Sequence, residues 1–101
     1  MGTYIVNVKS THLIADGDVF AGPARLLGVY YVADSTAGTI TIKDGGSGGT
    51  TVLILDTPLG AATAGQTNAY YVPIPGDGIR CETSCYADLS AGVTKATFFY
   101  G

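Results

Sequence analysis

Few residues of this chain are of types that catalyse reactions. His12 is the single histidine, so a Ser-His-Asp arrangement would have to form around it, and no GxSxG nucleophile motif occurs. Glu82 is the one glutamate, and most aspartates stand beside glycines, where carboxylates usually cap the backbone. These aspartates are Asp16, Asp18, Asp44 and Asp77. With no pair of carboxylates placed for acid–base work, the sequence predicts a protein that is not an enzyme and has no catalytic residues.

The possible metal and phosphate ligands are equally sparse. Cys81, Cys85 and His12 are three soft ligands with no recognised zinc spacing. The stretch from Asp16 to Asp18 lacks the further carboxylates that a calcium loop supplies at set intervals. The glycine-rich segment from Asp44 to Gly49 is not followed by the lysine and helix of a P-loop, so we interpret it as a hairpin loop. The sequence therefore predicts no metal site and no cofactor.

The two cysteines are predicted to be free thiols. On one extended strand the Cα atoms of Cys81 and Cys85 would lie roughly 13 Å apart, whereas a disulfide needs less than ~7 Å. The two residues could pair only across a tight bend. In a reducing compartment, two thiols that behave as small buried or half-buried apolar groups are the favoured interpretation.

Length and charge argue against several classes of protein. With 101 residues the chain is predicted to form a single domain, and 47% apolar against 13% charged residues argues against intrinsic disorder. The net charge is −3, and the cations are scattered singly, without the basic patch that a nucleic-acid-binding protein needs. They are Lys9, Arg25, Lys43, Arg80 and Lys95. We see no basic amphipathic helix, signal peptide or apolar run of ~20 residues, so we expect no membrane association and folding in a cytoplasm.

The pattern of apolar residues and turns predicts an all-β fold. Thr39 to Lys43 alternates, with Ile40 and Ile42 facing the core, and Gly28 inside a long apolar run predicts a bulge or a close backbone approach. Seven or eight strands with frequent turns indicate an antiparallel β-sandwich of jelly-roll or Greek-key type. The predicted strands are 4–8 with a possible extension at 11–14, 19–20, 25–32, 39–43, 50–56, 68–74, 79–84, 85–89 and 95–100, those at 79–89 being two short strands or one bent strand.

Groups of adjacent aromatic residues contain more rings than the core of a small domain needs. Neighbours on a strand point to opposite faces, so each aromatic group sends a ring inward and a ring outward. Three outward rings are more than a monomer surface usually carries, and tyrosine and phenylalanine are enriched in the cores of protein interfaces. The last strand, with aromatics on both faces, is expected to meet the sandwich core on one side and a second chain on the other. The predicted interface residues are Tyr4, Tyr30, Tyr31, Tyr70, Tyr71, Phe98, Phe99 and Tyr100.

Three segments resemble a known group of proteins. Tyr31 to Gly45 fits the pattern Y-x-x-x-x-x-A-G-x-(I/L)-x-(I/L)-(K/R)-D-G, and Ile74 to Cys81 fits (I/L)-P-G-x-G-(I/V)-(R/K)-(F/C). Phe98 to Gly101 fits (V/F)-F-Y-G. These patterns recur in short β-sandwich proteins encoded by tailed phages, many of them cyanophages, and the match covers roughly the last three quarters of the chain. Cys81 and Cys85 depart from a stretch that is often rich in Phe or Ile in that group.

The resemblance implies a non-enzymatic virion structural protein. Members are similar to capsid cement or decoration proteins and to small head–tail accessories. The implied partners are the major capsid protein or other virion subunits and further copies of the chain, with a homotrimer at capsid three-fold positions as the expected assembly. The implied location is the virion, most of all the capsid surface, after assembly in the host cytoplasm.

Two further hypotheses accompany this one. The segment 1–11 is a candidate N-terminal strand or arm that adds a strand to a neighbouring subunit. The alternative function is a tail or neck accessory, or a glycan-binding module of a tail fibre or spike that uses residues around Tyr70 to Pro75. Exposed tyrosines can stack on sugars, although such sites usually prefer tryptophan, which this chain lacks.

Overall fold

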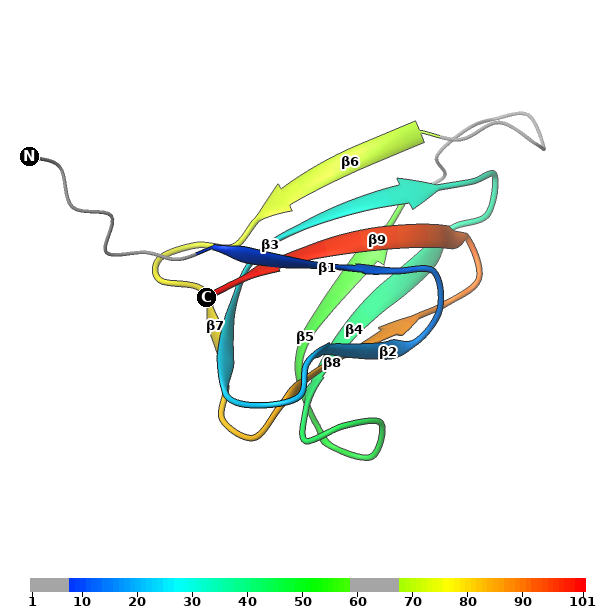
Figure 1. Cartoon of the computed structure of the whole chain (residues 1–101). Coiled ribbons are helices and arrows are strands. Elements are labelled where there is room, and N and C mark those ends of the chain that lie inside the picture. Colours follow the sequence, from blue (N-terminus) through cyan, green and yellow to red (C-terminus); the bar gives the residue numbers. More distant parts are fainter. Residues whose placement is uncertain (1–7, 59–67) are drawn as a thin grey trace, which may run out of the picture.

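The structure, a computed structural model, describes residues 8–58 and 68–101 and forms a β-sandwich (Figure 1). The described residues contain nine strands in two antiparallel sheets and no helix, so none that could cross a membrane. The strands are β1 (Lys9–Leu13), β2 (Gly17–Phe20), β3 (Ala24–Ala33), β4 (Gly38–Asp44), β5 (Thr50–Thr57), β6 (Asn68–Pro73), β7 (Ile79–Cys81), β8 (Cys85–Leu89) and β9 (Val93–Tyr100). The predicted all-β antiparallel sandwich is confirmed.

The two layers have different strand orders. Sheet A runs β1-β9-β3-β6, with β7 also paired to β3, and sheet B runs β2-β8-β4-β5. Strands β6 and β7 pair with the same strand at successive positions, β7 opposite Ala24–Leu26 and β6 opposite Gly28–Ala33. A turn in which Gly78 N–H donates to Pro75 C=O (3.3 Å) separates them. The structure has nine strands where seven or eight were predicted, because 79–89 forms two strands and not one bent strand.

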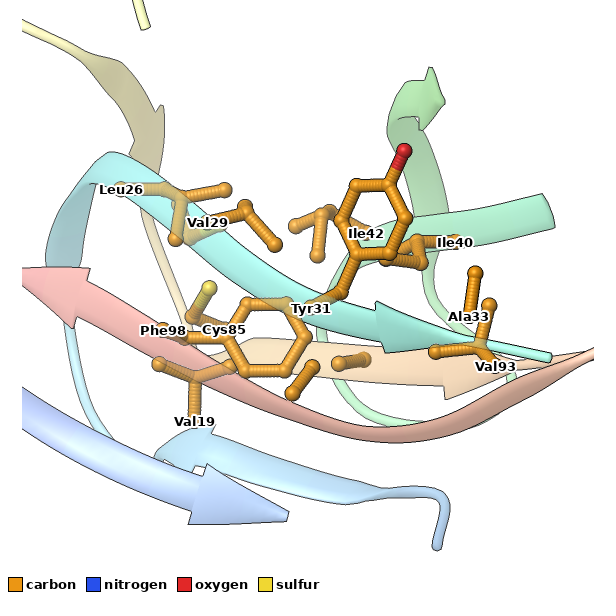
Figure 2. Packing of buried hydrophobic residues seen from close by; sticks show 13 residues of the cluster. Val19, Leu26, Val29, Tyr31, Ala33, Ile40, Ile42, Cys85, Val93 and Phe98 are labelled. Atoms are coloured by element: carbon orange, nitrogen blue, oxygen red, sulfur yellow. The ribbon is translucent and has the colours of Figure 1, made fainter. Parts of the chain in front are cut away.

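The core lies between the sheets and comes from the inward residues of both (Figure 2). Ile40 and Ile42 of β4 are fully buried, as their alternation predicts. Phe98 of β9 and Leu26 and Val29 of β3 face them from sheet A, also without exposed surface. Burying a side chain of this size stabilises the fold by about 1.5–3 kcal/mol. These residues make the inner face of β3 and β9 structural and leave the opposite face for other roles.

The corner between β7 and β8 is held by a carboxylate from β4. Asp44 accepts hydrogen bonds from the backbone N–H groups of Glu82 (2.9 Å), Thr83 (2.8 Å) and Ser84 (3.3 Å). These bonds end β7 at Cys81 and direct the chain into the other sheet. The predicted strand 79–84 is therefore too long, and 79–89 forms two strands in different sheets. The expected role of aspartates as backbone caps is confirmed for Asp44.

Cys81 and Cys85 flank this corner and are free thiols without exposed surface, as predicted. The bend brings the two side chains close enough to hydrogen-bond each other. Burial raises the pKa of both thiols. The neighbouring Cys81 raises the pKa of Cys85 further, whereas Cys85 offsets part of the increase at Cys81. Both therefore remain protonated and pack as apolar groups of the core.

The predicted N-terminal arm falls only partly within the described residues. Lys9 to Thr11 belong to β1, where they pair with Tyr100, Phe99 and Phe98 of the same chain. This part of the predicted arm extends sheet A of its own subunit. Residues 1–7, including Tyr4, lie outside the described residues.

Candidate functional site

The outer face of sheet A carries a row of aromatic and polar residues. Tyr30 of β3 is paired with Thr97 of β9 on one side and with Tyr71 of β6 on the other, and Thr97 is paired with His12 of β1. Paired residues of antiparallel strands point to the same face of the sheet, so these four side chains form one line across four strands. Tyr30 is 42% exposed and Tyr71 59% exposed. The row therefore presents two rings to the surroundings.

The next row explains how these rings are arranged. Gly28 is paired with Phe99 and with Pro73, and it has no side chain to fill its place on the outer face. The ring of Tyr71 lies over this position and meets Phe99 edge-on, with 6.1 Å between ring centroids and an interplanar angle of 76°. Edge-to-face contact at this separation is a favoured arrangement for two rings. A register shift between Leu26 and Gly28 confirms the bulge, one of the two alternatives predicted there. The group that approaches Gly28 closely is the side chain of Tyr71 and not the backbone of another strand.

The three outward rings line an open hollow in the surface of sheet A. Its volume is about 320 Å³, and its lining is mostly apolar. The lining residues are Val8, Leu27, Tyr30, Tyr71 and Phe99. We call this surface the aromatic hollow. A second hollow of about 310 Å³ adjoins it at Tyr30 and is more polar. There the imidazole Nδ1 of His12 lies 3.2 Å from the hydroxyl oxygen of Thr97.

The other predicted interface residues lie elsewhere. Tyr31 is 4% exposed and Phe98 is fully buried, so both rings belong to the core (Figure 2). Tyr70 packs against Tyr31 at 5.5 Å between centroids, and Tyr100 stacks on Phe20 at 5.3 Å. Burial raises the pKa of the Tyr31 hydroxyl, and neighbouring Tyr70 raises it further. Tyr4 lies outside the described residues. The structure thus brings Tyr30, Tyr71 and Phe99 together out of the eight.

Two residues of the aromatic hollow are absent from the sequence-based prediction. Leu27 lies at the bulge of β3, where alternation of inward and outward residues is interrupted, so its face could not be read from the pattern. Val8 precedes β1 and is 56% exposed. Gly28 was the available signal, because a bulge predicted there implies that its neighbour Leu27 changes face.

The hollow offers shape and apolar area for binding. Within residues 8–58 and 68–101 no three His, Cys, Asp or Glu side chains lie close enough together to hold a metal ion. The chain matches no family model, no curated protein and no solved structure.

Proposed function

We propose that this chain is a non-enzymatic structural subunit of a tailed-phage virion. In this proposal it is a capsid cement or decoration protein that binds and stabilises capsomers of the major capsid protein as a homo-oligomer. The observation that carries the proposal is the aromatic hollow, in which Tyr30, Tyr71 and Phe99 gather on one open sheet face. The resemblance of Tyr31–Gly45, Ile74–Cys81 and Phe98–Gly101 to small phage virion proteins supports it.

Energetics favour a protein partner for this face. A Tyr or Phe side chain buries about 150–250 Å² when fully covered, and apolar area contributes about 25 cal/mol per Å² removed from water. Tyr71 and Tyr30 keep much of that area exposed in the isolated chain. A standard interface covers about 800 Å² on each partner and often centres on tyrosines in a pocket. The aromatic hollow has the composition of such a centre.

The strand order also supports the proposal. Counting β6 and β7 as one edge, the eight strands follow the orders β1-β9-β3-β6 and β2-β8-β4-β5. We infer from these orders that the sandwich is a jelly roll, an architecture found in viral capsid and lectin domains. A jelly roll is consistent with a virion subunit.

A glycan-binding or tail accessory module is the second candidate. Tyr71 and Tyr30 present rings on which a sugar could stack. Sugar sites also place several polar groups around the ligand, whereas the residues that line the aromatic hollow are all aliphatic or aromatic. This lining favours the protein partner.

The proposal is tested by copy number. Quantitative mass spectrometry of purified virions should find the chain in a fixed, high ratio to the major capsid protein. A handful of copies per particle would instead assign it to the neck or tail. Absence from the particle would overturn the proposed function. Binding of the protein to a glycan on an array, lost when Tyr71 and Tyr30 are replaced, would support the alternative.

A further inference from the structure

The two sheets carry opposite charge. The five strands of sheet A contain no Asp or Glu, and the four strands of sheet B contain one cation, Lys43. The cations of sheet A are Lys9, Arg25, Arg80 and Lys95, and the carboxylates of sheet B are Asp18, Asp44, Asp56 and Asp88. Cations that are scattered in the sequence thus collect on one layer of the sandwich. Two copies stacked with sheet A on sheet B would bring opposite charges together.

The outer face of sheet B exposes carboxylates that its one cation does not neutralise. Lys43 lies 3.7 Å from Asp88, so its charge is already paired. Tyr86 lies near three aspartates, Asp16, Asp88 and Asp18. The pKa of its hydroxyl is raised, mainly by partial burial and further by these three negative charges. Asp56 is exposed on β5 and points outward, because Leu55 beside it packs on the core.

One large apolar side chain projects from this acidic face. Ile54 of β5 is 59% exposed and is paired with Thr41, while its neighbours Leu53 and Leu55 pack against the core. Thr41 is in turn paired with Asp88, so an aliphatic knob and a carboxylate lie on one line across β5, β4 and β8. An isolated exposed isoleucine needs no explanation. Here, however, a protruding apolar side chain on sheet B matches an apolar hollow of the same molecule on sheet A.

We propose that copies of this chain associate heterologously, with Ile54 of one copy seated in the aromatic hollow of the next. The hollow, at about 320 Å³, has room for an isoleucine side chain, and its walls are the apolar Val8, Leu27 and Phe99 with two tyrosine rings. Knob and hollow lie on opposite faces of the sandwich, so the contact repeats from copy to copy. Such an interface closes into a ring when its rotation allows and otherwise forms a chain.

The spacing of charges fits the same docking. Asp56 lies two residues from Ile54 along β5, and Arg25 lies two residues from Leu27 along β3. Two residues of a strand span about 7 Å. When β5 of one copy runs antiparallel to β3 of the next, Ile54 beside Leu27 brings the carboxylate of Asp56 near the guanidinium of Arg25. Arg80 is paired with Arg25 across the sheet, so two cations face Asp56 there against the one carboxylate of Asp77, which lines a hollow with Arg25 and Leu27. Charge and shape thus select the same partner, a second copy.

Two variants that each introduce a charge of the same sign as the facing sheet test the contact. Ile54→Lys places a cation against the basic sheet A, and Tyr71→Asp places a carboxylate against the acidic sheet B. Sedimentation velocity should show each variant at least about tenfold weaker in self-association than the unaltered protein, as expected for a residue central to an interface. Ile14→Lys is the matched control, since Ile14 is 75% exposed and outside both sheets. It should associate like the unaltered protein.

Mixing the two variants distinguishes this interface from a symmetric one. Each variant retains the surface that the other has lost, so an equimolar mixture should form heterodimers. If two aromatic hollows faced each other, Ile54→Lys would associate normally. Normal association of Ile54→Lys would overturn the inference. It would also be overturned by a mixture of the two variants that stays monomeric at millimolar protein. A third contradicting result is an unaltered protein that stays monomeric while its sheet A binds a single-stranded oligonucleotide.

The inference rests on the proposed homo-oligomer but can fail separately from it. A chain that is abundant in virions yet monomeric in solution overturns the heterologous contact and leaves the virion role standing. A chain that assembles through Ile54 and is absent from virions supports the contact and overturns the virion role.

Discussion

The ring of Tyr71 occupies the place that a side chain at Gly28 would take. A Cβ built on Gly28 would lie 2.8 Å from the hydroxyl oxygen of Tyr71 and 3.1 Å from the nearest ring carbon. The glycine therefore lets the tyrosine lie flat on sheet A and contact Phe99. A missing side chain on β3 thus shapes one wall of the aromatic hollow.

Gly28→Ala should displace Tyr71 while leaving the sandwich folded. Alanine in a strand is intrinsically better than glycine by about 0.5–1 kcal/mol, and the displaced ring offsets that gain. In a Tyr71→Ala background the same change should be stabilising, because the obstructing ring is gone. Chemical denaturation of both singles and the double variant measures the coupling. Additive effects would show that the ring does not rest on Gly28.

Asp44→Ala should destabilise the corner between β7 and β8 and lower the melting temperature by several degrees. The variant leaves the backbone N–H groups of Glu82, Thr83 and Ser84 without their acceptor. Asp56→Ala, on the exposed side of β5, is the matched control and should change the melting temperature little. Equal effects of the two substitutions would contradict the role assigned to Asp44.

The same corner should become sensitive to acid. The hydrogen bonds from Glu82, Thr83 and Ser84, with a smaller effect of Arg80, lower the pKa of Asp44 below its ordinary value of 3.8. Its contribution to stability is therefore complete above pH 3.8 and is lost as the pH falls below that value through the lowered pKa. Asp44→Ala should remove this part of the acid dependence in melting curves. An unchanged profile would contradict the assignment.

Truncation of Phe98 should destabilise the fold far more than truncation of Phe99. Phe98→Ala should lower the free energy of unfolding by about 3–5 kcal/mol, because the side chain is fully buried. Phe99→Ala should cost about 1 kcal/mol or less, since its ring lies on the outer face, and should weaken partner binding instead. Where Phe98→Ala does not fold, Phe98→Leu gives a smaller loss to compare. Similar destabilisation by both alanine variants would contradict the inward and outward assignment.

The thiols of Cys81 and Cys85 should be inert in the native protein. Both are fully buried and their pKa values are raised, so the reactive thiolate is rare. A disulfide-exchange reagent should react slowly with the native chain and quickly after denaturation. Rapid stoichiometric reaction under native conditions would show that the corner opens readily.

Local patterns in the sequence predict much of this fold. Alternation is sufficient to assign Ile40 and Ile42 to the core, and adjacent aromatics are sufficient to expect rings on both faces. Which ring of a pair faces inward depends on strand register, so Tyr31 and Phe98 could not be separated from Tyr30 and Phe99 in advance.

Longer-range relationships were out of reach of the sequence. The end of β7 depends on a carboxylate some 40 positions earlier in the chain, Asp44. The segregation of charge depends on which sheet each strand joins, so Arg25 and Arg80 appear scattered in the sequence but are paired across β3 and β7. The bulge beside Leu27 could be predicted from Gly28, but the neighbours of Leu27 in the aromatic hollow depend on the pairing of β3 with β6 and β9.

The most direct test of the account is binding of purified protein to capsids that lack it. The virion proposal predicts saturable binding of the unaltered chain in a fixed ratio to the major capsid protein. Tyr71→Asp should weaken that binding, because the aromatic hollow joins copies into the homo-oligomer that engages the capsid at several points, and Ile14→Lys should preserve it. Failure of the unaltered protein to bind, or undiminished binding by Tyr71→Asp, would contradict the claim that the aromatic hollow is a contact surface of a virion subunit.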